Sequence, residues 1–93
     1  MKLLLKLEKI IIKKRNLAQE KMDKYRSEIR ERENDIRLRA GIITIAEFNR
    51  MKTRIATLNN FIKDEEHRYH YFYEILCIIN SLKQESNETD KIN

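Results

Sequence analysis

Two histidines in the second half of the chain come nearest, by type and spacing, to a metal site. His67 and His70 lie about one helical turn apart, and Asp64, Glu66 and Glu74 supply carboxylates close by. Zinc requires three or four ligands, which in structural sites converge from more than one element. The first half of the chain has no histidine or cysteine to complete such a set. We therefore expect no metal, and predict i,i+4 contacts of His70 with Glu66 and Glu74 on a solvated face.

Cys77 is the only cysteine, and its chemistry is either nucleophilic attack or packing. No histidine lies three or four residues from it, and its neighbours are apolar, so the sequence predicts a small core residue. A single cysteine cannot form an internal disulfide, which is compatible with a reducing compartment. The chain also lacks a glycine-rich phosphate loop and a Ser, His and Asp set that would converge. We predict no enzyme activity and no cofactor.

Residues 69–73 read Tyr-His-Tyr-Phe-Tyr, a cluster of rings of the kind that stacks on single-stranded nucleic acid. On a helix these five side chains point all around the axis. Residues 1–40 carry 13 basic but also 7 acidic side chains, which dilutes any positive field along them. A solvated charged face is therefore favoured over nucleic-acid binding.

The composition favours helices as the elements that position these residues. The 93 residues include no proline and one glycine, and 38 % of them are charged, which suits one small all-α domain. No segment approaches the roughly 18 consecutive apolar residues of a membrane helix. Lys6, Glu8 and Lys9 interrupt the apolar start of the chain, which is not typical of a signal sequence. We expect a cytoplasmic protein.

Gly41 marks the predicted end of the first helix. A glycine just after a helix commonly adopts the left-handed conformation, which costs little without a Cβ atom. Ile42 would then fold back on the last helical turn as the hydrophobic partner of a Schellman-type cap. The sequence therefore predicts that the chain turns at Gly41.

The residues after Gly41 predict the start of a second helix. Thr44 and Glu47 have the spacing of a capping box, in which the hydroxyl and the carboxylate each accept the other residue's amide proton. Ile43 and Phe48 have the spacing of a hydrophobic staple. With so short a connection, the second helix must return alongside the first.

These signals predict an all-α protein, made of two long antiparallel helices that form a coiled-coil hairpin. We predict a hairpin over residues 1–84, with helices over 2–40 and 44–84, a turn at 41–43, and a disordered polar tail over 85–93. At 1.5 Å per residue each arm is roughly 60 Å long, so the molecule is a rod.

Apolar residues spaced alternately by three and four positions form the predicted contact between the arms, here called the seam. In the second arm the seam consists of Phe48, Met51, Ile55, Leu58, Ile62, Glu65, Tyr69, Phe72, Leu76 and Ile79. In the first arm it consists of Leu4, Ile11, Ala18, Met22, Tyr25, Ile29 and Ile36, with Arg15 and Arg32 intruding. Folding at the turn brings Arg15 near Glu65. Either these two form an ion pair that sets the register, or Glu65 reaches out to solvent.

The end of the hairpin far from Gly41, here called the open end, has more apolar residues than a two-helix seam can bury. These residues fall on more than one face and include Leu3, Leu5, Leu7, Ile10, Ile12, Ile75, Cys77, Ile78 and Leu82. Contiguous exposed apolar surface usually marks an interaction site. We therefore expect the open end to oligomerise or to insert into a partner.

Residues 40–62 carry a family resemblance. The features are the Ala40-Gly41-Ile42 break, Phe48 a few residues later, and then Ile55, Thr57-Leu58 and Ile62. In these features the chain resembles the FliJ/YscO family, small coiled-coil proteins of flagellar and virulence type III secretion systems. The two long arms favour this family over short oligomerisation hairpins with a similar turn.

The resemblance implies a stalk similar to that of rotary ATPases, which inserts into the ring of the secretion ATPase and also contacts the export gate and chaperones. By this analogy, the residues that enter the ring are Leu3, Leu4, Leu7, Ile10, Ile11, Ile75, Ile78 and Leu82. The positions aligned with the family's gate-contacting face are Arg54, Leu58 and Phe61. The implied location is the cytoplasmic face of a secretion apparatus.

Two other functions stay open at the level of the sequence. One is a secretion chaperone or self-assembling helical adaptor, which shares the hairpin and the surplus apolar surface. The other, less favoured, is a nucleic-acid-binding coiled coil, whose affinity would fall steeply with salt.

Overall fold

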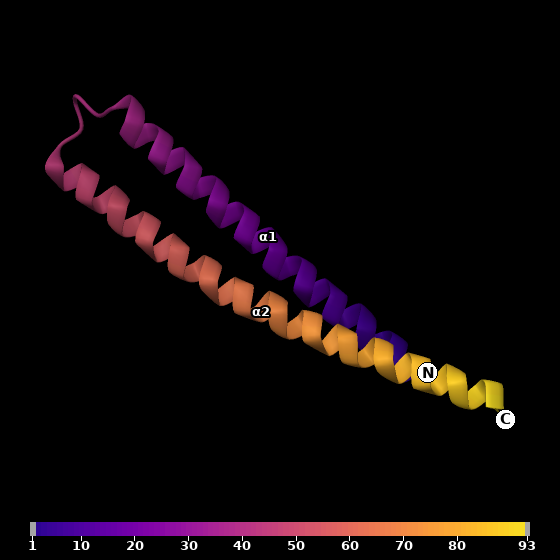
Figure 1. The fold of residues 1–93 in the computed structure, drawn as a ribbon. Helices are drawn as coiled ribbons and strands as arrows, with labels where there is room; N and C mark the ends of the chain where they lie inside the picture. Colours follow the sequence, from indigo (N-terminus) through magenta and orange to yellow (C-terminus); the bar gives the residue numbers. More distant parts are fainter. Residues whose placement is uncertain (1, 93) are drawn as a thin grey trace.

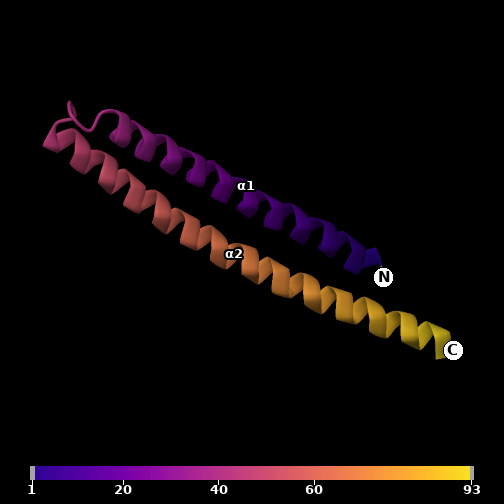
Figure 2. The same ribbon diagram turned by 45° about the horizontal axis from the view of Figure 1, so that its top comes forward.

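The chain forms two long antiparallel helices joined by one short connection (Figures 1 and 2). In the computed structural model, which describes residues 2–92 and the side chains of residues 2–86, α1 spans Lys2–Leu38 and α2 spans Ile45–Ile92. The Cα trace extends over 75 × 16 × 15 Å along its principal axes. Both views place the connection at one end, and α2 extends beyond the start of α1. The predicted all-α hairpin is confirmed.

The seam holds the two helices together through two clusters of buried side chains. The cluster nearer the turn consists of Met22, Ile29, Leu58 and Ile62, and the one nearer the open end consists of Ile11, Leu76 and Ile79. Every α2 seam position from Phe48 to Ile79 is buried or half-buried. Each fully buried aliphatic side chain contributes roughly 1.5–3 kcal/mol by leaving water. The predicted spacing therefore identifies the buried face correctly.

The helix ends differ from the predicted bounds. α1 ends at Leu38, two positions before residue 40, and α2 begins at Ile45. α2 then continues through Ile92, so the structure has helix where the sequence predicts a disordered tail, while Asn93 lies outside the described residues. After Gly41 the chain contains no glycine or proline, and the tail's Gln, Glu and Lys residues are compatible with helix.

Gly41 does not adopt the predicted left-handed conformation, because none of the described residues has a positive φ. The Arg39 carbonyl instead accepts hydrogen bonds from the amides of Ile42, at 2.9 Å, and Ile43, at 2.8 Å. Ile42 is 78 % exposed, so it does not fold back on α1. A Cβ atom at Gly41 would meet no atom within 4 Å. Neither backbone conformation nor space requires glycine here.

Thr44 caps α2, but the predicted capping box forms only on one side. The Thr44 hydroxyl accepts a hydrogen bond from the Glu47 amide at 3.2 Å. The Glu47 carboxylate does not return to the Thr44 amide; it accepts a hydrogen bond from Arg39 Nη2 at 2.8 Å. Ile43 and Phe48, the predicted staple, are both half-buried. Glu47 thus links the two helices across the turn.

Candidate interaction surfaces

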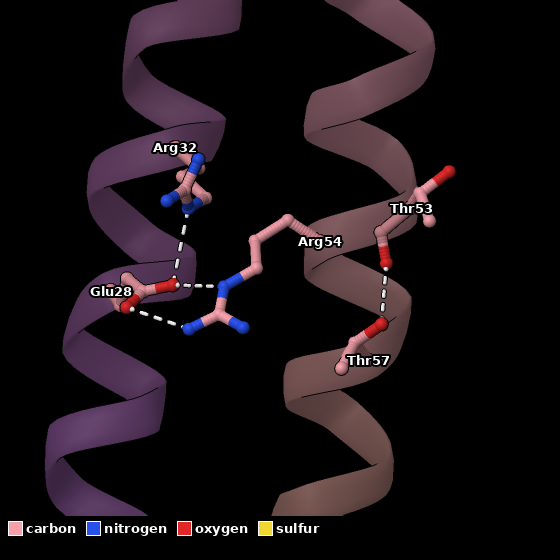
Figure 3. A network of polar contacts seen from close by, with 5 residues as sticks. All are labelled: Glu28, Arg32, Thr53, Arg54 and Thr57. Atoms are coloured by element: carbon pink, nitrogen blue, oxygen red, sulfur yellow. Dashed lines mark hydrogen bonds and ion pairs between the residues drawn. The ribbon is translucent and has the colours of Figure 1, made fainter.

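A polar network around Glu28 joins the helices in the half of the rod nearer the turn (Figure 3). Arg54 of α2 reaches across to Glu28 of α1, with Nε donating to Oε2 at 2.9 Å and Nη2 donating to Oε1 at 3.4 Å. Arg32 Nε donates to the same carboxylate at 3.1 Å. The hydrogen bond from Arg54, with that from Arg32, lowers the pKa of Glu28, and the same bond raises the pKa of Arg54. The carboxylate is thus engaged by two guanidinium groups.

The Glu28–Arg54 pair identifies one side of the rod, here called the Glu28 side. In a supercoiled helix pair, residues seven positions apart stay on the same side. Steps of seven toward the open end lead from Glu28 to Lys21, Lys14 and Leu7, and from Arg54 to Phe61, Arg68, Ile75 and Leu82. Lys14, Lys21 and Arg68 line one common groove, which confirms that the two rows share a side.

The Glu28 side becomes apolar toward the open end. Residues four positions before those of the two rows lie next to them on the same helix. Toward the open end these neighbours are apolar, whereas nearer the turn they include Lys24, Arg50 and Asp64. The resulting surface, here called the open-end face, consists of Leu3, Leu7, Ile10 and Leu17 of α1 with Tyr71, Ile75, Ile78 and Leu82 of α2. Ile75 is half-buried, and the other seven side chains are 43–81 % exposed. Among the described residues, thirteen large apolar side chains are exposed, and seven of them belong to this face.

Six of the eight residues predicted to enter an ATPase ring belong to the open-end face. The other two, Leu4 and Ile11, lie in the seam instead. Leu4 lies on the seam and is half-buried. Ile11 is 7 % exposed and packs against Leu76 and Ile79, so it belongs to the hairpin's own core and offers no surface to a partner. Leu17 and Tyr71 join the face although they are absent from the predicted set. Their side of the rod becomes clear only from the heptad steps.

The predicted gate-contacting set does not form one exposed surface. Leu58 is 0 % exposed and belongs to the core cluster nearer the turn. Arg54 is half-buried and held by Glu28. Phe61 is 40 % exposed, with its ring centroid 5.5 Å from that of Tyr25. Of the three residues, Phe61 alone presents exposed apolar surface.

Glu65 is buried in the seam without either of the two predicted environments. It is 4 % exposed, so it does not reach solvent. Its carboxylate accepts a hydrogen bond from Arg68 and lies 4.0 Å from Lys21 Nζ. Arg15 instead donates to Asn16 at 3.4 Å. The negative charge of Glu65 is therefore compensated by two cations on the Glu28 side. Arg68 lies one turn away on the same helix, and Lys21 lies on α1.

Three exposed apolar residues at the turn were missed at the level of the sequence. Leu38, Ile42 and Ile45 are 76–81 % exposed. The sequence predicts that Ile42 packs on the end of the first helix, so its exposure was not expected. Their exposure could have been predicted, because none of the three residues falls on the three-and-four spacing of the seam.

The residues with candidate chemistry stay apart. No set of three or more His, Cys, Asp or Glu side chains gathers as a metal site within the described part of the chain. The predicted contacts of His70 with Glu66 and Glu74 do not form: His70 packs edge-on against the Tyr69 ring, and Glu66 pairs with Arg26 at 3.4 Å. The prediction that Cys77 is a core residue is wrong, because Cys77 is exposed.

Neither α1 nor α2, over the residues described, contains a stretch apolar and long enough to cross a lipid bilayer. Comparisons with protein-family models, with curated proteins and with solved structures find no match to this chain. Its function is therefore proposed from the surfaces described above and from the resemblance of residues 40–62.

Proposed function

We propose that this chain is the stalk and escort component of a bacterial type III secretion system, and that its open end inserts into the ring of the export ATPase. The observation that carries the proposal is the open-end face, an apolar surface at the open end of a narrow two-helix rod. Apolar surface of this extent usually marks a binding site. The resemblance of residues 40–62 to FliJ/YscO proteins supplies the identity of the partner.

The shape of the rod supports a mechanical role over a catalytic one. The Cα trace is only 16 and 15 Å across, as expected for two packed helices, so the interior holds only the seam. Chemistry would have to occur on an open surface, where water is not excluded. A rod of this width presents its apolar surface laterally, which suits insertion between other subunits.

Contact with the export gate is part of the proposal, and it depends on Phe61. Among the aligned positions, Phe61 has exposed apolar surface, whereas Leu58 is closed inside the seam and Arg54 is held by Glu28. The proposed location is the cytoplasmic face of the secretion apparatus, where the stalk would also receive free chaperones.

Binding of this chain to the export ATPase of its own organism is the direct test. We expect the purified chain to bind the assembled ring, and the double variant Leu7→Glu, Ile78→Glu to lose at least tenfold in affinity, on the order expected for central interface residues. Both substitutions lie on exposed positions, so the hairpin should keep its helical circular dichroism.

The matched control is Leu38→Glu, Ile42→Glu, which places the same two charges on exposed residues at the turn. It should bind the ring as the wild type does. Absence of binding by the wild-type chain, or equal loss of binding in both double variants, would contradict the proposal.

A further inference from the structure

The open-end face has the pattern of a helical bundle and not that of a two-stranded coil. A two-stranded coiled coil needs two apolar positions in each heptad, whereas a core-facing helix of a bundle needs a wider stripe. Nearer the turn, the Glu28 side has charged residues such as Glu28 and Arg54 flanking the seam. Over residues 3–17 and 71–82 the same side has apolar residues on both helices, with Lys14 as the one charged interruption. The pattern of this part of the rod therefore indicates packing against further helices.

We propose that a second copy of this chain covers the open-end face, and that the two hairpins form a four-helix bundle over residues 3–17 and 71–82. The face is two helices wide, with four residues from α1 and four from α2, which matches a partner that is itself two helices wide. A twofold axis through the face makes it self-complementary, as in most homodimers. The proposal stands on this face and does not rest on the proposed function. Because one face cannot hold both partners at once, the dimer would have to dissociate before the open end enters the ATPase ring.

The exposed area is sufficient for a stable dimer. Seven of the eight side chains are 43–81 % exposed. Together they offer on the order of 700 Å², close to the roughly 800 Å² that each partner contributes to a standard interface. The face includes an aromatic residue, Tyr71, and large aliphatic residues such as Ile10, and aromatic residues are enriched at interface cores.

The charges at the edge of the face select the orientation of the two copies. Lys14 lies within the face, between Ile10 and Leu17, while Lys21 and Arg68 continue it toward the turn; all three line one groove. If the two rods lay side by side in the same direction, the cations of one copy would lie opposite the cations of the other copy, and they would repel each other. If the rods point in opposite directions and overlap at their open ends, the cations lie on opposite sides of the twofold axis.

Sedimentation equilibrium of the full chain tests the dimer. We expect the wild type to be a dimer at about 100 µM, and Ile10→Glu, Ile78→Glu to weaken self-association at least about tenfold with unchanged helical circular dichroism. The control Leu38→Glu, Ile42→Glu should remain a dimer. A monomeric wild type, or equal dissociation of both variants, would overturn the proposal. A monomer that still bound the export ATPase would leave the proposed function standing.

Disulfide trapping tests the orientation, in a Cys77→Ser background that removes the native thiol. Rods in opposite directions bring residue 3 of one copy near residue 17 of the other. We therefore expect a mixture of the Leu3→Cys and Leu17→Cys variants to form a mixed disulfide, while Leu17→Cys alone stays reduced under mild oxidation. Rapid self-linkage of Leu17→Cys would contradict the opposed arrangement.

Discussion

The half of the rod near the turn and the half near the open end share one seam but differ on the Glu28 side. Near the turn, the seam is flanked by ion pairs, with Arg54 bound to Glu28 on one side and Arg26 near Glu66 on the other. Near the open end, apolar residues of both helices replace these charges on one side. The first half is complete as a two-helix coil, whereas the second still has apolar surface to bury. The same hairpin thus combines a segment whose apolar residues are buried in the seam with a segment that leaves apolar surface exposed.

The comparison predicts that truncating an apolar residue lowers the stability of the monomer far more near the turn than on the open-end face. Leu58 is fully buried near the turn, so Leu58→Ala should lower the free energy of unfolding by about 2–5 kcal/mol through lost burial and an internal cavity. Ile10→Ala on the open-end face should change the stability of the monomer by less than about 0.5 kcal/mol. Urea unfolding at low protein concentration measures both. Equal losses would show that the two halves do not differ in this way.

The buried carboxylate at the junction of the halves predicts a smaller change of the opposite sign. Glu65→Leu continues the apolar seam, and its former partners Lys21 and Arg68 are exposed enough to return to water. We expect the free energy of unfolding of the variant to be about 1–2 kcal/mol higher than that of the wild type. Its register should become less specific, because a polar seam residue penalises slipped pairings. Thermal unfolding reports the first effect. A destabilised variant would instead show that the ion pairs contribute net stability.

The turn offers a test confined to the connection. Because the φ angle of Gly41 is not positive and a Cβ atom there has open space, Gly41→Ala should stabilise the hairpin by about 0.4–1 kcal/mol, mainly by restricting the unfolded chain. Thermal unfolding of the variant and the wild type measures this difference. If Gly41→Ala were destabilising, the turn would need a left-handed residue after all.

The smallest expected effect is a pH dependence localised to the half near the turn. The guanidinium of Arg54 lowers the pKa of Glu28, so the folded state holds this proton less tightly than the unfolded state does. The ordinary pKa of glutamate is roughly 4, and above that pH the stabilisation is fully present. It is lost as the pH falls through the lowered pKa of Glu28. Glu28→Gln should flatten the acid limb of the stability curve. An unchanged acid limb would contradict the assignment.

The sequence predicts the hairpin well because its seam is long and regular. Ten spaced positions from Phe48 to Ile79 outweigh any single exception, so even Glu65 does not disturb the register. The details that escape prediction depend on side-chain reach and loop geometry. The predicted partner of Glu65 was Arg15, whereas Lys21 and Arg68 reach it instead. The open-end apolar residues can be named from the sequence, but their gathering on one side follows only once Glu28 is seen to pair with Arg54.

The single connection between the helices has a consequence for how the rod opens. Residues close to the turn pair after closing a short loop, while Ile11 and Ile79 meet only at the end of a long one. Local unfolding starts at free ends, so the open end frays first and its amide protons should exchange with solvent faster than those around Leu58. The open-end face therefore lies on the segment whose persistence depends most on being covered. A partner that binds there would act as a clasp, slowing amide exchange over residues 3–17 and extending the lifetime of the whole hairpin.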